Sequence, residues 1–276
     1  MRRKPIDRDR REALREELGK LARGSKAGII SHSGAMAILG FDARRTTLRL
    51  HSLIRRGWLR RVRRGLFLVR PLESEMHAAP TVEDPWILSS QMFEPCYIGG
   101  WSAAENWDLT EQIFRSTFVV TARPVARSEL RIHGMEFHLV HVPPHRVESV
   151  EPIWRGKERI RVASRERVIA DGLVNPIWLG GIRQVAAMLA VYRTSERWRP
   201  DRFRAELEIV GTGAAYKRFG YILEVLHLET DELVKTAEGR RTTGIVKLDP
   251  SIPTRGRLNR HWGLWVNSTI KREETV

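Results

Sequence analysis

The segment FDARRTTLRLHSLIRRGWLRRVRRGLFLV, residues 41–69, decides the fold of the N-terminal part of the chain. Asp42 is a favoured helix N-cap residue, and the apolar residues after it recur with helical spacing up to Gly57, where the helix is expected to end. WLRRV and LFLV are then two short runs of strand-forming residues, separated by RRG at 63–65. Glycine supplies the positive φ of a tight hairpin, so the segment predicts a helix followed by a β-hairpin.

The residues before this segment predict two more helices. Residues 8–23 carry leucines at i, i+4 and i+7, as an amphipathic helix requires. GIISHSGAMAILGF, residues 28–41, then contains a short helix for which Ser33 is the expected N-cap and Gly40 the end. This order of elements, with three helices followed by a hairpin, predicts a winged helix-turn-helix.

The helix after Asp42 has two expected faces. A core-facing set follows the i, i+4, i+7, i+11 spacing, namely Ala43, Thr47, Leu50 and Ile54. Half a turn away, the same spacing gives a cationic stripe of Arg45, Arg49, Ser52 and Arg56. Such a stripe is typical of a recognition helix in a major groove, and its first turn is expected to reach base edges. The alternative, a merely solvated face, fits poorly with nine arginines and one acid between residues 42 and 64.

The charge of the chain is concentrated at its N-terminal end. The formal net charge is +15, and residues 1–72 hold 20 Lys and Arg against 6 Asp and Glu, whereas the rest hold 28 against 27. This asymmetry is expected of a small module that binds a polyanion, joined to a near-neutral domain. An interfacial membrane helix is not expected, because glycines at 57 and 65 interrupt the basic stretch and its second half is strand-like.

Other composition features narrow the class of protein. The single cysteine, Cys96, excludes an internal disulfide and every multi-cysteine metal site. No apolar run approaches a membrane span, and the N-terminus is charged without an apolar segment behind it, so we expect a cytoplasmic protein without a secretory signal. We expect no cofactor and no metal. His133, His138, His141 and His145 are close in sequence, but 138 and 141 would point to opposite faces of a strand.

A second domain is expected to follow a linker. Residues 73–85 are polar and proline-bearing, and residues 86–276 then show strands, several helices and further strands, which indicates an α+β domain with a mixed or antiparallel sheet. Ser102 with Glu105 forms a capping-box pattern, and Ser164 is an expected N-cap of the helix RERVIADGLV.

Several blocks of the chain resemble one family. RRGWLRRVRRGLFLV resembles the wing of the AbiEi-type antitoxins, which are transcriptional regulators of type IV toxin–antitoxin (abortive infection) systems. YIGGWSAAENWDLTEQIFRSTFVVT, VASRERVIADGLVNPIWLGGIRQV and KLDPSIPTRGRLNRHWGLWVN look like successive blocks of the C-terminal domain of that family. The resemblance spans roughly residues 28 to 267. No single block is as specific as a metal-binding cysteine set, but four blocks in the right order are harder to obtain by chance.

The resemblance implies a repressor that binds inverted repeats in double-stranded DNA upstream of its own operon, with two copies on the operator. Its C-terminal domain would counteract a nucleotidyltransferase-like toxin. Together with the helical stripe, the resemblance gives the expected DNA-binding residues: Arg44, Arg45, Thr46, Arg49, Ser52, Arg56, Arg60, Arg63 and Arg64. The basic N-terminal stretch, residues 1–10, could be a DNA-contacting arm or a tail.

Two alternatives remain open from the sequence. One is an ordinary winged-helix repressor whose second domain senses a ligand or dimerises. The other is a nucleic-acid-processing enzyme that the N-terminal module targets. Glu166 and Asp171 form the nearest carboxylate pair on one predicted helix, but their i, i+5 spacing places them on different faces. We expect Glu166 to be exposed and Asp171 to bind a backbone group or an arginine, so no catalytic residues are expected.

Overall fold

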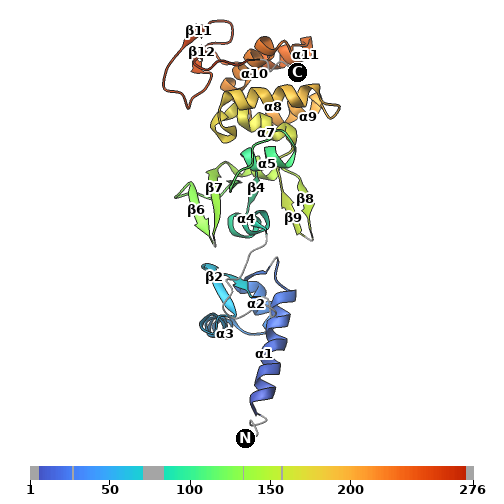
Figure 1. Ribbon diagram of the computed structural model, residues 1–276, viewed down its shortest axis with the longest axis vertical. Coiled ribbons are helices and arrows are strands. Elements are labelled where there is room, and N and C mark those ends of the chain that lie inside the picture. The colour runs from blue at the N-terminus through green and yellow to red at the C-terminus, as the bar shows by residue number, and fades with distance from the viewer. Residues whose placement is uncertain (1–5, 27, 71–83, 133, 157, 272–276) are drawn as a thin grey trace. The chain divides into compact units, whose positions relative to one another are not determined.

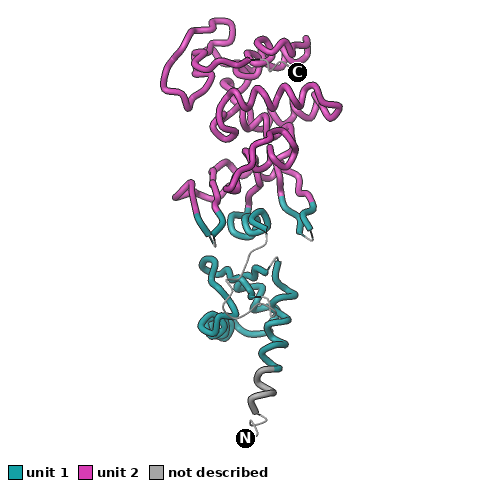
Figure 2. Tube along the Cα trace, in the orientation of Figure 1, with its two compact units in different colours: residues 1–94, 131–135, 154–160 teal, residues 95–130, 136–153, 161–276 magenta. Residues whose placement is uncertain are grey.

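The structure is a computed structural model that describes residues 6–26, 28–70, 84–132, 134–156 and 158–271. The chain has an α+β fold and divides into two compact units (Figure 2). Unit 1 comprises residues 1–94, 131–135 and 154–160, and unit 2 comprises residues 95–130, 136–153 and 161–276. The linker expected over 73–85 lies mostly outside the described residues, as does the start of the basic N-terminal stretch.

Residues 6–70 form a winged helix, drawn in blue and cyan in Figure 1. Its elements are α1 (Ile6–Arg23), β1 (Ile29–Ser31), α2 (His32–Leu39), α3 (Ala43–Arg55), β2 (Leu59–Arg63) and β3 (Leu66–Val69). The three strands form an antiparallel sheet in the order β1-β3-β2, in which β2 and β3 are the wing. The three helices and the hairpin agree with the fold expected from the sequence, whereas β1 and its pairing with β3 were not predicted.

Local caps explain where the helices of the winged helix begin and end. Asp42 caps α3 as predicted, because its carboxylate accepts a hydrogen bond from the backbone N–H of Arg45 at 2.7 Å. The predicted cap of α2 is wrong by two residues: Ser31, not Ser33, accepts from the backbone of Gly34 at 3.0 Å. Ser31 can do so because it is still in extended geometry as the last residue of β1.

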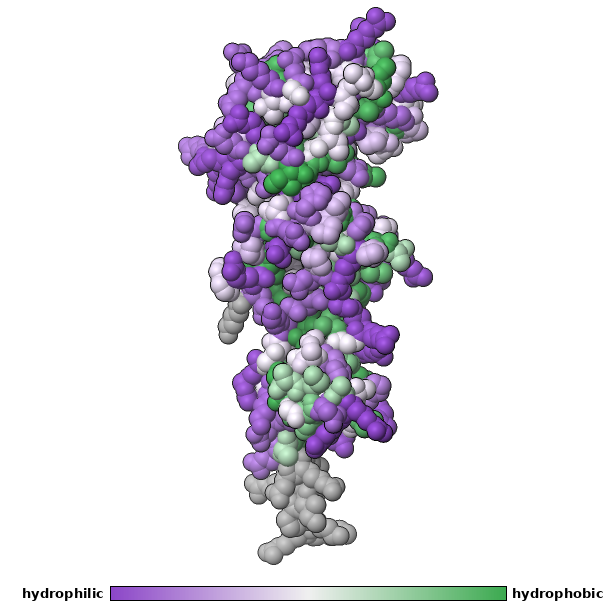
Figure 3. Space-filling model, turned by 180° about the vertical axis from the view of Figure 1, so that it is seen from behind, coloured by the Kyte–Doolittle hydropathy of each residue, from purple (hydrophilic) through white to green (hydrophobic). Residues whose placement is uncertain are grey.

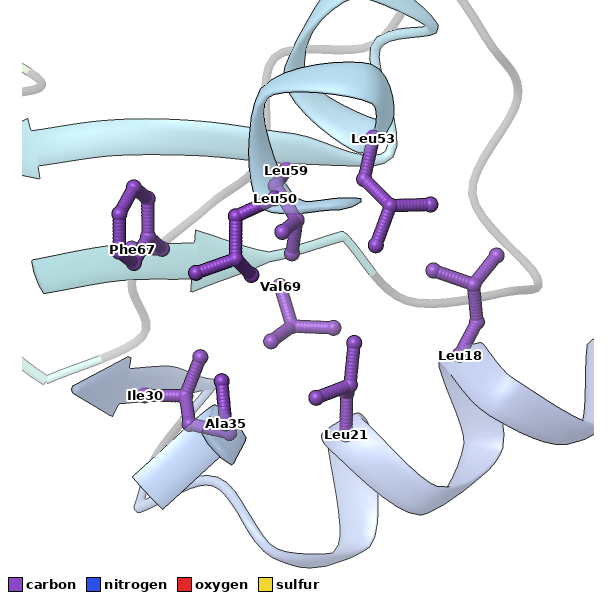
Figure 4. Close-up of a cluster of buried hydrophobic side chains, with 9 residues drawn as sticks. All are labelled: Leu18, Leu21, Ile30, Ala35, Leu50, Leu53, Leu59, Phe67 and Val69. Carbon is purple, nitrogen blue, oxygen red and sulfur yellow. The ribbon is translucent and has the colours of Figure 1, made fainter. Parts of the chain in front are cut away.

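The winged helix is stabilised by one apolar cluster (Figure 4). Nine buried side chains from α1, α2, α3 and all three strands converge there: Leu18, Leu21, Ile30, Ala35, Leu50, Leu53, Leu59, Phe67 and Val69. Leu50 and Leu53 point from α3 into the cluster, and Leu18 and Leu21 enter it from α1. The cluster therefore fixes the rotation of α3 about its axis, which decides the residues that α3 presents to solvent.

The chain after residue 84 begins with a helix and four paired strands. The elements are α4 (Pro85–Phe93), β4 (Cys96–Ile98), α5 (Gly100–Asn106), β5 (Ser116–Thr121), β6 (Glu129–Ile132) and β7 (Met135–His141). The sheet has the order β4-β5-β7-β6, with β4 antiparallel and β7 parallel to β5, so it is a mixed sheet as expected. The predicted capping box is wrong, because α5 already begins at Gly100; Ser102 instead accepts a hydrogen bond from the Phe118 backbone at 2.9 Å and ties α5 to β5.

A hairpin and a group of helices follow. They are α6 (Pro144–Glu148), β8 (Pro152–Arg155), β9 (Glu158–Arg161), α7 (Arg165–Val174), the 3-10 helix η1 (Pro176–Leu179), α8 (Ile182–Thr194), α9 (Pro200–Val210), α10 (Gly213–Leu226) and α11 (Asp231–Gly239). Helix α7 packs against α5, α8, α9 and α10. Eight of its ten residues are buried, so α7 is the central helix of unit 2. Ser164 caps it as predicted, accepting from the Arg167 backbone at 3.1 Å.

A small sheet ends the described chain. Its strands are β10 (Val246–Lys247), β11 (Arg257–Asn259) and β12 (Leu264–Val266), in the order β10-β12-β11. Arg218 of α10 joins this sheet to α7, because its guanidinium donates to the carbonyls of Leu173, Leu248 and their neighbours at 2.8–3.1 Å. Burial lowers the pKa of Arg218 to about 10, although the charge of Asp249 acts to raise it. The arginine therefore satisfies strand and helix-end carbonyls that would otherwise be buried without donors.

No helix in the described part of the chain is both long and apolar enough to cross a bilayer. On the face drawn in Figure 3, hydrophilic residues predominate and apolar residues occur in small separate patches.

Candidate nucleic-acid interface

The orientation of α3 differs from the sequence expectation. Its fully buried residues are Thr46, Leu50 and Leu53. Of the core set expected from the pattern, Leu50 is buried and Ile54 packs partly against the core, whereas Ala43 and Thr47 are exposed. The helix is therefore rotated by roughly 60–70° from the orientation that the pattern predicted, at about 100° per residue.

The rotation changes the face that α3 presents to solvent. Opposite the buried residues lie Arg44, Leu48, His51 and Arg55, which follow one another at helical spacing and are all exposed. We call these four residues the α3 outer face. No described carboxylate pairs with Arg44 or Arg55. The outer face is thus cationic at both ends, with a leucine and a histidine between them.

Of the six DNA-binding residues expected on this helix, only Arg44 belongs to the outer face, and two of the others, Thr46 and Arg49, contact the rest of the winged helix instead. The prediction for Thr46 is wrong, because its side chain is 0% exposed and packs toward the core. Arg49 is only partly exposed, and its guanidinium makes a bidentate ion pair with Glu17 of α1, with Nε at 2.7 Å from one carboxylate oxygen and Nη2 bonded to the other. The hydrogen bond that Arg49 donates to Glu17 raises the pKa of Arg49. The main role of Arg49 is therefore to connect α3 to α1.

Replacing Arg49 by alanine should destabilise the winged helix. The change leaves the half-buried Glu17 carboxylate without its two charged donors, which costs about 1.5–3 kcal/mol of unfolding free energy. Urea titration of the full chain, with hydrogen exchange of α1 and α3 amides, would measure the loss. Arg45→Ala is the matched control on the same helix and should cost less than about 1 kcal/mol. An equal effect of the two variants would mean that the Glu17 pair adds nothing.

The first turn of α3 carries positive charge where a helix alone would disfavour it. Arg44 and Arg45 lie next to the positive end of the helix dipole, and the turn contains no acidic residue apart from the Asp42 cap. Arg45 is exposed and its guanidinium lies 4.1 Å from the centre of the Phe41 ring, which holds it beside the outer face. A bound anion would reverse this unfavourable electrostatic balance, since helix N-termini and arginines both attract phosphate.

The turn between α2 and α3 is held by a pair of polar side chains. His32, the first residue of α2, forms a 2.9 Å hydrogen bond with the hydroxyl of Thr47, which also donates to the Ala43 carbonyl at 2.8 Å. The bond links the two helices of the helix-turn-helix at its exposed side. It therefore fixes the angle between α2 and α3.

The wing adds a second cationic surface. Arg60, Arg63 and Arg64 are exposed as predicted, and so is Arg61, which the sequence reading did not select. The register of β2 against β3 shifts between Arg61 and Arg63, so a bulge lets neighbouring arginines point outward. Of the two other predicted residues, Arg56 is exposed at the C-terminal cap of α3, whereas Ser52 is half-buried on its flank.

In unit 2 the two carboxylates of α7 are both buried. Tyr192 donates a hydrogen bond to Glu166, which is 6% exposed, so the expectation of an exposed Glu166 is wrong. Asp171 is 1% exposed and binds arginines, as expected: it accepts from Arg146 at 2.5 Å and from Arg167 at 3.3 Å. Tyr97 also donates to Asp171, at 2.7 Å. A carboxylate with three donors has little capacity left for a metal ion.

The histidines, Cys96 and the surface depressions do not form a common site in the described part of the chain. His138 stacks on Phe118 with ring centroids 4.9 Å apart, and burial lowers its pKa, while His141 is exposed and bonds to the Arg123 carbonyl. His133 lies outside the described residues, and among the described ones no three His, Cys, Asp or Glu side chains are placed to share a metal. Cys96 is buried, as expected of a small packing residue. Two open surface depressions of about 600 and 460 Å³ lie in unit 2 and hold no such group of ligands.

Comparison with known proteins supports the fold but gives no information about the function. No protein-family model matches the chain, and no curated protein is similar to it. Among solved structures, the fold is similar to the crystal structure of the RV2827C protein from Mycobacterium tuberculosis, with a TM-score of 0.56 and 15% sequence identity. The similarity covers 90% of this chain and 88% of the other, so both units take part in it.

Proposed function

We propose that this protein is a transcriptional repressor that binds double-stranded DNA through α3 and the wing. The observation that carries the proposal is the pairing of two exposed cationic surfaces on one winged helix: the α3 outer face and the arginines of β2. An α-helix fits the major groove, and a wing beside it can bind phosphates or the neighbouring minor groove. One recognition helix covers one half-site, so two copies on an inverted repeat are expected.

The first test is binding of the purified full chain to DNA from upstream of its own gene, against scrambled DNA of the same composition. Fluorescence anisotropy across a salt series should show tighter binding to the upstream DNA. The logarithm of the affinity should fall linearly with the logarithm of salt, by about 0.9 for each phosphate neutralised. A slope corresponding to at least about four phosphates is expected from the arginines of the two surfaces. Equal affinity for both DNAs would reduce the site to a nonspecific basic surface.

The resemblance to AbiEi-type antitoxins supports a second role, carried by unit 2. We propose that this unit counteracts a nucleotidyltransferase-like toxin encoded beside it, and that the protein works in the cytoplasm and represses its own operon. Coexpression with the neighbouring toxin tests this role: the full chain should restore growth. An α3 variant defective in DNA binding should still restore growth when both genes are driven from foreign promoters. Loss of rescue with a folded unit 2 would contradict the proposed separation of roles.

The rival interpretations make different predictions. An ordinary winged-helix repressor would show the DNA binding but no rescue. A nuclease would cleave plasmid DNA with divalent metal, and the activity would be lost in Asp171→Ala. The buried environment of Asp171 argues against that chemistry, because all of its contacts are to protein donors.

A further inference from the structure

Leu48 is an unusual residue on the α3 outer face. It is 65% exposed, and it is the one exposed large apolar side chain among the described side chains between residues 12 and 70. Single exposed leucines are common on protein surfaces, so exposure alone means little. Its position is informative: Arg44 precedes it by four residues and His51 follows by three, so Leu48 lies in the middle of the cationic outer face.

We propose that Leu48 reads the C5-methyl group of a thymine in the major groove. The major-groove edges of the base pairs offer hydrogen-bond donors and acceptors, and one apolar group, the thymine methyl. A leucine can gain little from the polar edges, whereas it can bury this methyl. The inference rests on the proposed function, and it adds a base preference at the centre of the recognition helix. The arginines on either side would bind guanine or phosphate.

The charges on α3 argue against the other occupant that an exposed leucine suggests, a second copy of the same face. Apposing two outer faces would place Arg44 and Arg55 of one copy near those of the other. The acid at the start of the helix, Asp42, is engaged in capping and does not neutralise them. Like charges at an interface oppose association, whereas a DNA groove supplies the opposite charge together with an apolar group.

The test removes single methyl groups from the DNA. A duplex carrying the upstream sequence that the full chain protects is synthesised with each thymine in turn replaced by deoxyuridine, which removes the methyl and keeps the hydrogen-bonding edge. Affinities are measured for the wild type and for Leu48→Ala. One replacement per half-site should weaken wild-type binding about fourfold, as expected for burial of one methyl. The same replacement should change the affinity of Leu48→Ala by less than about 1.5-fold.

The outcomes separate this inference from the proposed function. If thymine replacement weakens both proteins equally, or neither, while upstream DNA is still preferred over scrambled DNA, Leu48 does not read a methyl and the repressor remains. If the wild type shows no preference for any duplex, both proposals fail. Because Leu48 is exposed, Leu48→Ala should keep the wild-type melting temperature. Leu48→Gln is a second variant that should also lose the methyl dependence, since glutamine pairs with adenine instead.

Discussion

Asp171→Ala is expected to destabilise unit 2 by about 3–5 kcal/mol, which is a large part of the stability of an ordinary domain. The carboxylate lies between Arg146 and Arg167, and the Arg167 side chain is completely buried. Removing the carboxylate leaves two guanidiniums close together with one partner fewer. Burial lowers the pKa of Arg167, but Asp171 and its other acidic neighbours outweigh burial and raise it. The arginine therefore stays charged and its charge must be compensated.

Other contacts of Arg167 limit how far the structure can adapt. Its guanidinium also donates to Ser149 at 2.9 Å, to Glu206 at 3.0 Å and to the Arg146 carbonyl at 2.5 Å. These bonds fix it in place when Asp171 is removed, so the guanidinium keeps only Glu206 as an acidic partner and cannot move to water. Tyr97 loses its acceptor as well. A buried network with one member missing costs more than one bond.

Urea unfolding of the full chain, followed by hydrogen exchange of the α7 amides, would measure the effect in unit 2 itself. The matched control is Asp201→Ala on α9, where the side chain is 85% exposed and pairs with Arg204 at the surface. This control should cost less than about 1 kcal/mol. Asp171→Asn keeps the shape and should fall between the two. If Asp171→Ala cost no more than the control, the network would not be stabilising α7.

The sequence predicts the winged helix well because its signals are local. The Asp42 cap, the glycines at 40 and 65 and the strand-forming runs each act within a few residues. Helix α4 was not predicted, although Asp84 followed by Pro85 is a recognised start signal: the carboxylate caps Trp86 at 2.8 Å and proline occupies the first turn.

The rotation of α3 could not be decided from its sequence pattern. Leu50 fits both possible core faces, and each face then adds one threonine and one apolar residue: Thr46 with Leu53, or Thr47 with Ile54. Because they share Leu50, the two faces differ by only roughly 65° around the helix axis. Packing against Leu18 and Leu21 of α1 selects the first, and the Glu17 to Arg49 pair spans 32 positions in the chain. Tertiary contacts of this kind leave no signal in a local pattern.

The orientation of α3 leads to the second large expected effect. Arg44→Ala combined with Arg55→Ala should weaken binding to the upstream DNA about thirtyfold or more, because each arginine on the outer face is worth at least about 1 kcal/mol at a base or phosphate. Neither arginine pairs with a described carboxylate and both are exposed, so the melting temperature should not fall. Anisotropy with upstream and scrambled duplexes measures affinity and selectivity together.

Two further variants are needed to interpret the effect of the α3 substitutions. Arg60→Ala with Arg64→Ala removes two charges from the wing and should weaken binding to both duplexes by a similar factor, with a smaller salt slope, because phosphate contacts carry no sequence information. Arg127→Ala with Arg202→Ala removes two exposed charges from unit 2 and controls for net charge. If the α3 variant lowered affinity for both duplexes equally, its arginines would bind only phosphates. Selectivity would then depend on Leu48, His51 and the shape of the DNA, which are the groups that the outer face would still offer.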